Sequence, residues 1–199
     1  MLMNFQPRRG ILLNWKILIA LVALSTLGFT LAYASGMGDK EAVPLYEVPA
    51  ETQGLEVAPI KSSIAPDFKL QDLGGDEVQL SNFRGHPVLI NLWATWCGPC
   101  RLEMPAIQDR FELSEEDGFV VLVVDFDKPV SEVKDFRDTL GLTFQILLDP
   151  GANVQKLYRN RTYPTSFFVD ESGVIQVHHI GLMTDRQLDD NLAEIGVGP

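Results

Sequence analysis

The sequence predicts an α/β fold in which a central mixed β-sheet is flanked by helices on both faces. Two near-continuous apolar runs, Pro87–Trp93 and Phe119–Phe126, are typical of strands that are buried on both faces. Segments with helical periodicity lie between the strand-like runs, and a strand pair around Glu171-Ser172-Gly173 precedes a last amphipathic segment. This alternation of strands and helices is typical of a layered α/β domain.

The expected elements follow one another along residues 64–199, and residues 36–63, which contain three prolines, are expected to form an extended linker. The expected strands are 67–70, 77–80, 87–93, 119–126, 144–149, 165–170 and 174–180. The first expected helix runs from the cysteines to about residue 116, because Leu102, Ile107 and Phe111 recur at roughly helical spacing. The other expected helices are 130–140, 152–158 and 185–195, the last with Thr184 as its N-cap.

The N-terminal residues 1–35 differ in composition from the rest of the chain. Met1–Gly38 carries three basic residues and no acidic one, whereas the remainder holds 13 Lys and Arg against 27 Asp and Glu. Within this segment, Ile17–Ala34 is a run of 18 residues without a charge. As a helix this run would span about 27 Å, close to the hydrocarbon thickness of a bilayer, about 30 Å. We therefore expect residues 1–35 to be a membrane anchor or a signal peptide.

The charges on either side of the apolar run predict its orientation. Arg8, Arg9 and Lys16 precede the run and acidic residues follow it, so the positive-inside rule places the N-terminus in the cytoplasm. Ala32-Tyr33-Ala34 also resembles the small-residue site of a cleaved signal peptide, while the length of the run favours an uncleaved single-pass anchor. In either case the acidic domain is expected to face outside the cytoplasm, and its charge argues against nucleic acid as a partner.

The only two cysteines of the chain lie in Trp96-Cys97-Gly98-Pro99-Cys100. A disulfide across two residues constrains little of the unfolded chain, so a purely structural role is disfavoured. Cys97 follows a buried strand and opens a helix, where unpaired backbone N–H groups and the helix dipole stabilise a thiolate. Gly98 allows a tight turn, and Pro99 is tolerated in the first helical turn. The pattern predicts that Cys97 is the exposed nucleophile that attacks a partner's disulfide, and that the more buried Cys100 resolves the mixed disulfide.

A Cys-x-x-Cys pair can also be half of a metal site. Structural zinc needs two further ligands, and the chain offers no second cysteine pair. Its histidines are His86, His178 and His179, of which the last two are adjacent on an expected strand and would point to opposite faces. We expect no metal and no cofactor, and we keep one non-enzymatic alternative, a copper carrier that uses Cys97, Cys100 and His178 or His179.

The block LINLWATWCGPCRLEMP, the later RTYPTSFFVDESG and the order of elements resemble the thioredoxin superfamily. More narrowly, they resemble the membrane-anchored ResA/TlpA-like thiol:disulfide oxidoreductases of bacteria, with their redoxin or AhpC/TSA-like domain. The resemblance covers about residues 65–195. It implies a thioredoxin-like fold with an N-terminal β-hairpin extension and a transmembrane helix, and protein-disulfide reductase activity through a redox disulfide between Cys97 and Cys100.

The resemblance also implies roles for residues outside the cysteine pair. The family has a cis-proline facing the cysteines, and Pro164 matches it, so that the backbone of Tyr163 is free to pair with a bound substrate chain. These reductases carry an acidic residue three positions after the second cysteine, here Glu103, which could pass protons and set the thiol pKa values. The buried aspartate of cytoplasmic thioredoxins falls at Asn91, which cannot titrate and makes Glu103 more important. Trp96 is expected to cover one side of the thiols and to contact the partner.

The expected partners follow from the same resemblance. The expected substrate-binding residues are Trp96, Gly98, Pro99, Tyr163 and Pro164. The Gly-Pro dipeptide resembles that of reducing members, and a reductase outside the membrane needs electrons from within, which implies a membrane electron-relay thiol reductase. The frequent task of the family is to keep the haem-attachment cysteines of apocytochrome c reduced, so cytochrome c maturation is the expected pathway.

A peroxiredoxin-like peroxidase is the alternative enzyme. That class shares the fold and an opening in the style of PDFKLQDLGG. It needs a threonine and a proline arranged ahead of its reactive cysteine, whereas Thr95 lies two residues before Cys97 with no proline in the preceding turn. The sequence therefore favours the oxidoreductase.

Overall fold

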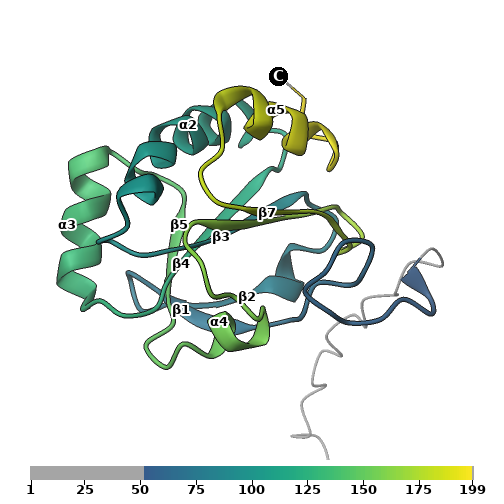
Figure 1. Ribbon diagram of the computed structural model, residues 1–199, viewed down its shortest axis with the longest axis horizontal. Helices are drawn as coiled ribbons and strands as arrows, with labels where there is room; N and C mark the ends of the chain where they lie inside the picture. The colour runs from purple at the N-terminus through teal and green to yellow at the C-terminus, as the bar shows by residue number, and fades with distance from the viewer. Residues whose placement is uncertain (1–51, 199) are drawn as a thin grey trace, which may run out of the picture. The chain divides into compact units, whose positions relative to one another are not determined.

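The computed structural model describes residues 52–198, all within one compact unit (Figure 1). The expected anchor or signal peptide at 1–35 and most of the expected linker lie outside the described residues. Within residues 52–198, no helix combines the length and the apolar character that crossing a bilayer requires.

A seven-stranded mixed sheet forms the centre of this unit, in the order β2-β1-β5-β4-β3-β6-β7. The strands are β1 (Lys69–Asp72), β2 (Glu77–Gln79), β3 (Val88–Trp93), β4 (Val120–Asp125), β5 (Gln145–Leu148), β6 (Thr165–Val169) and β7 (Ile175–Ile180). β3, β4 and β5 run parallel, whereas β6 pairs antiparallel with both β3 and β7. β1 pairs antiparallel with β5 and with β2, which follows it after a short turn. The mixed sheet confirms the predicted α/β class.

Helices cover both faces of the sheet. They are α2 (Gly98–Ser114), α3 (Val130–Leu140), α4 (Asn153–Leu157) and α5 (Asp185–Ala193), with a 3-10 turn, η2 (Leu80–Phe83). The residues of α2, α3 and α5 share one hydrophobic core with Leu89 and Trp93, while α4, η2 and the β1–β2 pair share the other with Val88 and Ile90. This alternation along β3 is the period-2 pattern of a strand buried on both faces. In Figure 1, α2 and α5 lie on one side of the sheet and α4 on the other.

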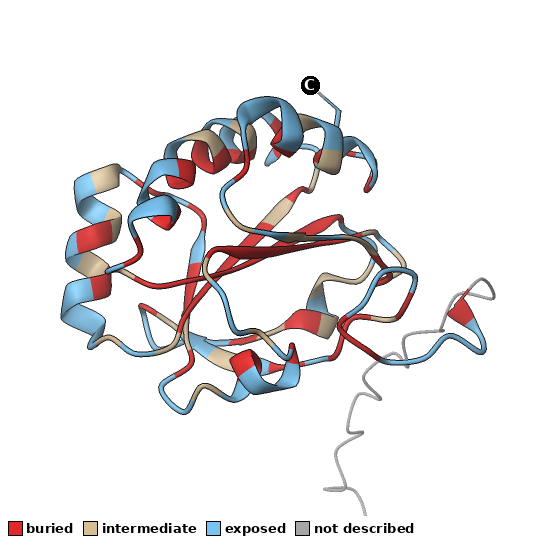
Figure 2. Cartoon of the chain, viewed as in Figure 1, coloured by how far each residue is buried: buried red, intermediate tan, exposed pale blue. Residues whose placement is uncertain are grey.

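The helices turn their buried sides toward the sheet, and local features fix where two of them begin. Figure 2 shows buried residues along the central strands and on the sheet-facing sides of the helices. α5 begins directly after its N-cap Thr184, as predicted, and Thr184 and Gln187 form a capping box in which each side chain bonds to the other residue's backbone N–H. α4 is shorter than predicted, because Ala152 has a left-handed backbone with φ 51° and the helix starts at the next residue.

One of the three apolar residues whose spacing predicted α2 does not lie on the buried face of the helix. Leu102 is 71% exposed. The buried face of the helix instead carries Cys100, Met104, Ile107 and Phe111, which follow the helical spacing of three and four residues. Leu102 lies two residues from both Cys100 and Met104, and this offset places it on the opposite side of the helix.

Candidate active site

Cys97 and Cys100 form a disulfide at the N-terminus of α2, at the carboxyl end of β3. The Cys97 N–H donates to the Ala94 carbonyl at 3.0 Å, and this bond turns the chain from the strand into the helix. Cys97 is the N-cap, and its Sγ accepts the Cys100 N–H at 3.2 Å. The same N–H and the positive end of the helix dipole would stabilise a thiolate at this sulfur.

Access to the disulfide differs from the prediction in one respect. Cys97 is only 4% exposed, not the exposed residue that was expected, although Cys100 is more deeply buried still at 0%. The Cys97 sulfur is bonded to the sulfur of the fully buried Cys100. The neighbouring Gly98 and Pro99 are exposed, and a Cβ on Gly98 would meet no heavy atom within 4 Å. A partner chain can therefore approach over this dipeptide.

Glu103 lies on α2 one turn after Cys100 and is only 2% exposed. Its Oε1 accepts a hydrogen bond from Asn91 Nδ2 at 2.8 Å, and its Oε2 accepts one from the Met183 N–H at 3.4 Å. Burial raises the pKa of Glu103 to about 7, and the two hydrogen bonds oppose this rise. Spacing alone indicated that Glu103 lies on the Cys100 side of the helix, and the structure adds that its carboxyl group is buried.

Asn91 reaches Glu103 because of its place on β3. Its neighbours Leu89 and Trp93, on the same face of the strand, pack into the core beneath α2. In the β3–β6 pair, Asn91 is the register partner of Ser166, and Asn91 Nδ2 donates to Ser166 Oγ at 2.9 Å. Three elements, β3, α2 and β6, thus bring Asn91, Glu103 and Ser166 together.

The second segment of the site is the turn that enters β6. The Tyr163–Pro164 peptide bond is cis, as the resemblance implied. The carbonyl of Pro164 accepts the Gly181 N–H at 2.9 Å, which ties this turn to the end of β7. Pro164 is buried and Tyr163 is half-buried, and pairing of this backbone with a substrate chain stays a prediction.

An aromatic cluster of Trp96, Tyr163 and Phe126 joins these two segments. The Trp96 ring is 59% exposed and meets the Tyr163 ring edge-on at 5.9 Å between centroids. The Tyr163 ring in turn stacks on Phe126 at 5.1 Å, and the Trp96 indole N–H donates to Asp127 Oδ2 at 2.9 Å. Phe126 and Asp127 were not predicted as site residues. Their position after a buried strand was the available signal, since functional residues gather at the carboxyl ends of such strands.

Asp125, the last residue of β4, holds the loop that carries Phe126 and Asp127. It is buried, and its Oδ1 accepts the backbone N–H groups of Asp127 at 3.2 Å and Lys128 at 3.0 Å. Burial raises the pKa of Asp125 to about 6. Asp125 is the register partner of Trp93 on β3, so it lies at the same edge of the sheet as the disulfide.

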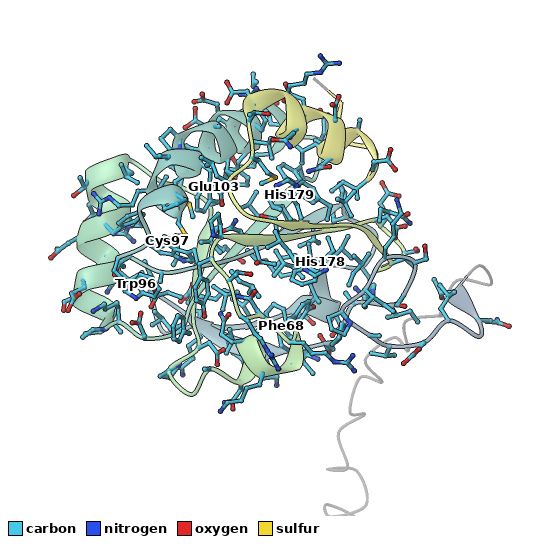
Figure 3. The ribbon with its side chains drawn as sticks, viewed as in Figure 1. Phe68, Trp96, Cys97, Glu103, His178 and His179 are labelled. Carbon is cyan, nitrogen blue, oxygen red and sulfur yellow. A yellow bond between two sulfur atoms is a disulfide. The ribbon has the colours of Figure 1, made fainter. Side chains whose placement is uncertain are left out.

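Two of the histidines, His178 and His179, lie on β7, while His86 lies in the bend before β3. Figure 3 shows Cys97 at the start of α2 and Glu103 in the first half of that helix. The His178 ring stacks on Phe167 at 4.3 Å, and burial lowers the pKa of His178. Within residues 52–198, no three His, Cys, Asp or Glu side chains are grouped so that they could hold a metal ion. The copper alternative therefore gains no support from the described part of the chain.

A disulfide at a helix N-terminus, a cis-proline and a thioredoxin-like sheet define a thiol:disulfide oxidoreductase of the thioredoxin superfamily. The family model described as the AhpC/TSA family matches residues 62–178, and the chain belongs to this family. Within it, the chain is a ResA/TlpA-like protein, as the following relatives indicate.

The chain is 33% identical over 177 residues to the thiol-disulfide oxidoreductase ResA of Geobacillus kaustophilus, a match that covers 89% of this chain and 92% of that protein. It is 42% identical over 132 residues to the thioredoxin-like protein YneN of Bacillus subtilis, covering 64% of this chain and 76% of YneN. Among solved structures, it resembles a Chlorobium tepidum protein described as a thiol:disulfide interchange protein, DsbE. That likeness has a TM-score of 0.64 at 31% identity and covers 69% of this chain and 99% of the other. These likenesses confirm the family and the enzyme class that the sequence predicted.

Proposed function

We propose that this oxidoreductase works as a protein-disulfide reductase outside the cytoplasm. The observation that carries the proposal is the Cys97–Cys100 pair at the N-terminus of α2, backed by the buried carboxyl group of Glu103. A Gly-Pro dipeptide between the cysteines is the thioredoxin arrangement, whose potential of about −270 mV lies at the reducing end of the range.

The proposed reaction transfers two electrons from the cysteine pair to the substrate. The Cys97 thiolate attacks one sulfur of the substrate disulfide, and the other sulfur leaves as a thiolate that takes up a proton from water. Glu103 then takes the proton of the Cys100 thiol, and the Cys100 thiolate attacks the Cys97 sulfur of the mixed disulfide. The substrate leaves with both sulfurs reduced, and the Cys97–Cys100 disulfide forms again.

The proposal includes the location and partners of the enzyme. Residues 1–35 would anchor the chain in the membrane with its acidic domain outside, which the apolar run and its basic flank support. A membrane electron-relay thiol reductase would reduce the Cys97–Cys100 disulfide after each turnover. The substrates would be proteins with disulfides, among them apocytochrome c, which gives the enzyme a place in cytochrome c maturation.

A redox titration and a trapping experiment test this proposal. Equilibration of the purified chain with thiol buffers should give a potential near −270 mV, while a value near −120 mV would make the chain an oxidant. In native membranes, a Cys100→Ala variant should accumulate mixed disulfides with its substrates, because the resolving thiol is missing. A Cys97→Ala variant is the matched control and should trap none. Equal trapping by both variants would contradict the assigned roles.

A further inference from the structure

The two ends of the Asn91 side-chain amide differ in their hydrogen bonding. Asn91 is fully buried, and its Nδ2 donates both of its protons, one to Glu103 Oε1 and one to Ser166 Oγ. Its Oδ1 is also buried and accepts no hydrogen bond from any residue within 52–198. An amide has a donor end and an acceptor end of similar size, so a half-turn about its last bond would exchange the two.

We propose that Asn91 is a positioning residue whose side-chain amide turns over as Glu103 gains and loses its proton. When Glu103 is ionised, Asn91 Nδ2 donates to Glu103 and Ser166, as in the structure. When Glu103 is protonated, Asn91 Oδ1 takes the place of Nδ2 and accepts from the carboxyl O–H of Glu103 and from the hydroxyl of Ser166. This inference rests on the proposed role of Glu103 in proton transfer.

The donor and acceptor capacities of the three groups support this exchange. An ionised carboxylate only accepts, a protonated carboxyl group can donate, and a serine hydroxyl does either. Without the turn, a proton on Glu103 Oε1 would face the Asn91 N–H, and a proton on Oε2 would face the Met183 N–H. Protonation of either oxygen would therefore set two donors against each other in a buried site, which is costly. One end of the amide has no partner in either orientation, so Asn91 does not lock Glu103 into one protonation state. A buried cation at this position would lock it ionised, and an aliphatic residue would keep it neutral.

The surroundings of Glu103 leave Asn91 as its main polar partner. Glu103 faces Asn91 on β3, the Met183 N–H from the segment before α5, and the disulfide on its own helix. The shift in its pKa comes from burial and from these two hydrogen bonds, without a contribution from another charged group. The Asn91 contact, at 2.8 Å, is much shorter than the 3.4 Å contact from Met183. The Asn91 amide is therefore the polar group that most affects whether Glu103 carries a proton.

NMR on the isotopically labelled, oxidised full chain in detergent micelles tests the turn directly, since the cysteines do not titrate in the disulfide. The Glu103 carboxyl carbon and the Asn91 side-chain nitrogen should shift with one common midpoint. A scalar coupling across the hydrogen bond from Asn91 Nδ2 to the Glu103 carboxyl carbon should be present above this midpoint and absent below it. A coupling that persists below the midpoint would overturn the inference, as would Asn91 signals that do not move.

A pair of variants gives a second readout. Asn91→Leu should raise the Glu103 midpoint by about one pH unit, because the hydrogen bond that the carboxylate loses is stronger than the one that the protonated carboxyl group loses. Gln108→Leu is the matched control: Gln108, also on α2, donates to Glu112 and Thr143 in the same way, and its loss should leave the midpoint in place. An unchanged midpoint in Asn91→Leu would refute the positioning role. Absence of reductase activity in the wild type would instead refute the proposed function, and the NMR titration does not depend on that activity.

Discussion

Replacing Glu103 with glutamine tests two effects of its carboxyl group: the ionised group destabilises the folded chain, and it acts as a base in catalysis. Burial raises the pKa of this carboxyl group from 4.5 to about 7, so between these values the folded chain binds a proton that the unfolded chain has lost. The free energy of unfolding must then fall as the pH rises through this window, by about 3 kcal/mol in all, and stay lower above it. Because glutamine cannot ionise, the variant does not lose this free energy of unfolding as the pH rises. Glu103→Gln should therefore be more stable than the wild type by up to about 3 kcal/mol near pH 8, and nearly equal to it near pH 4.

The same substitution should slow catalysis. Glutamine can still accept from Asn91 Nδ2, but it cannot take the proton of the Cys100 thiol. Resolution of the mixed disulfide should slow by roughly 10²-fold, at the low end of what a general base contributes. Denaturant titrations at the two pH values measure stability, and stopped-flow mixing with a disulfide peptide measures resolution. Glu116→Gln, at an exposed site just beyond α2, is the control and should change neither.

Two outcomes would refute this reasoning. A Glu103→Gln variant that resolves mixed disulfides at the wild-type rate from about pH 5 to 9 would show that the proton passes elsewhere. A variant that is less stable than the wild type near pH 8 would show that the ionised carboxylate does not destabilise the folded chain as its burial implies.

Three further predictions concern other parts of the site and chain. In the reduced protein, alkylation should label Cys97 faster than Cys100 at neutral pH, with a Cys97 pKa below about 8.5, and faster labelling of Cys100 would reverse their roles. Asp127→Ala removes the acceptor of the Trp96 indole N–H and should raise KM for a protein disulfide about threefold to tenfold while kcat for a small disulfide is unchanged. A fall in kcat for both substrates would assign Asp127 to the chemistry instead. Protease added outside intact cells should release the acidic domain from the membrane, whereas a soluble form that lacks Ile17–Ala34 would show that the segment is cleaved.

Much of the fold follows from local patterns in the sequence. The apolar runs of β3 and β4 predicted buried strands, and Thr184 predicted the start of α5, because periodicity and capping depend on residues a few positions apart. The exposure of Leu102 shows the limit of such local patterns. Apolar spacing along one segment does not reveal which side of a helix will meet the sheet.

The sequence by itself determined the reactive pair, its place where a strand gives way to a helix, and the neighbouring Glu103, since all of these lie within one short segment. Only the tertiary structure decided that Glu103 meets Asn91 and that Asn91 meets Ser166, which lies 75 residues further along the chain. It likewise set the Trp96 ring beside Tyr163. These contacts depend on the order of the strands and on the register between β3 and β6. That register is selected because it buries the apolar side chains on both faces of the sheet. These side chains come from residues that lie far apart in the chain, so local sequence patterns do not reveal the register.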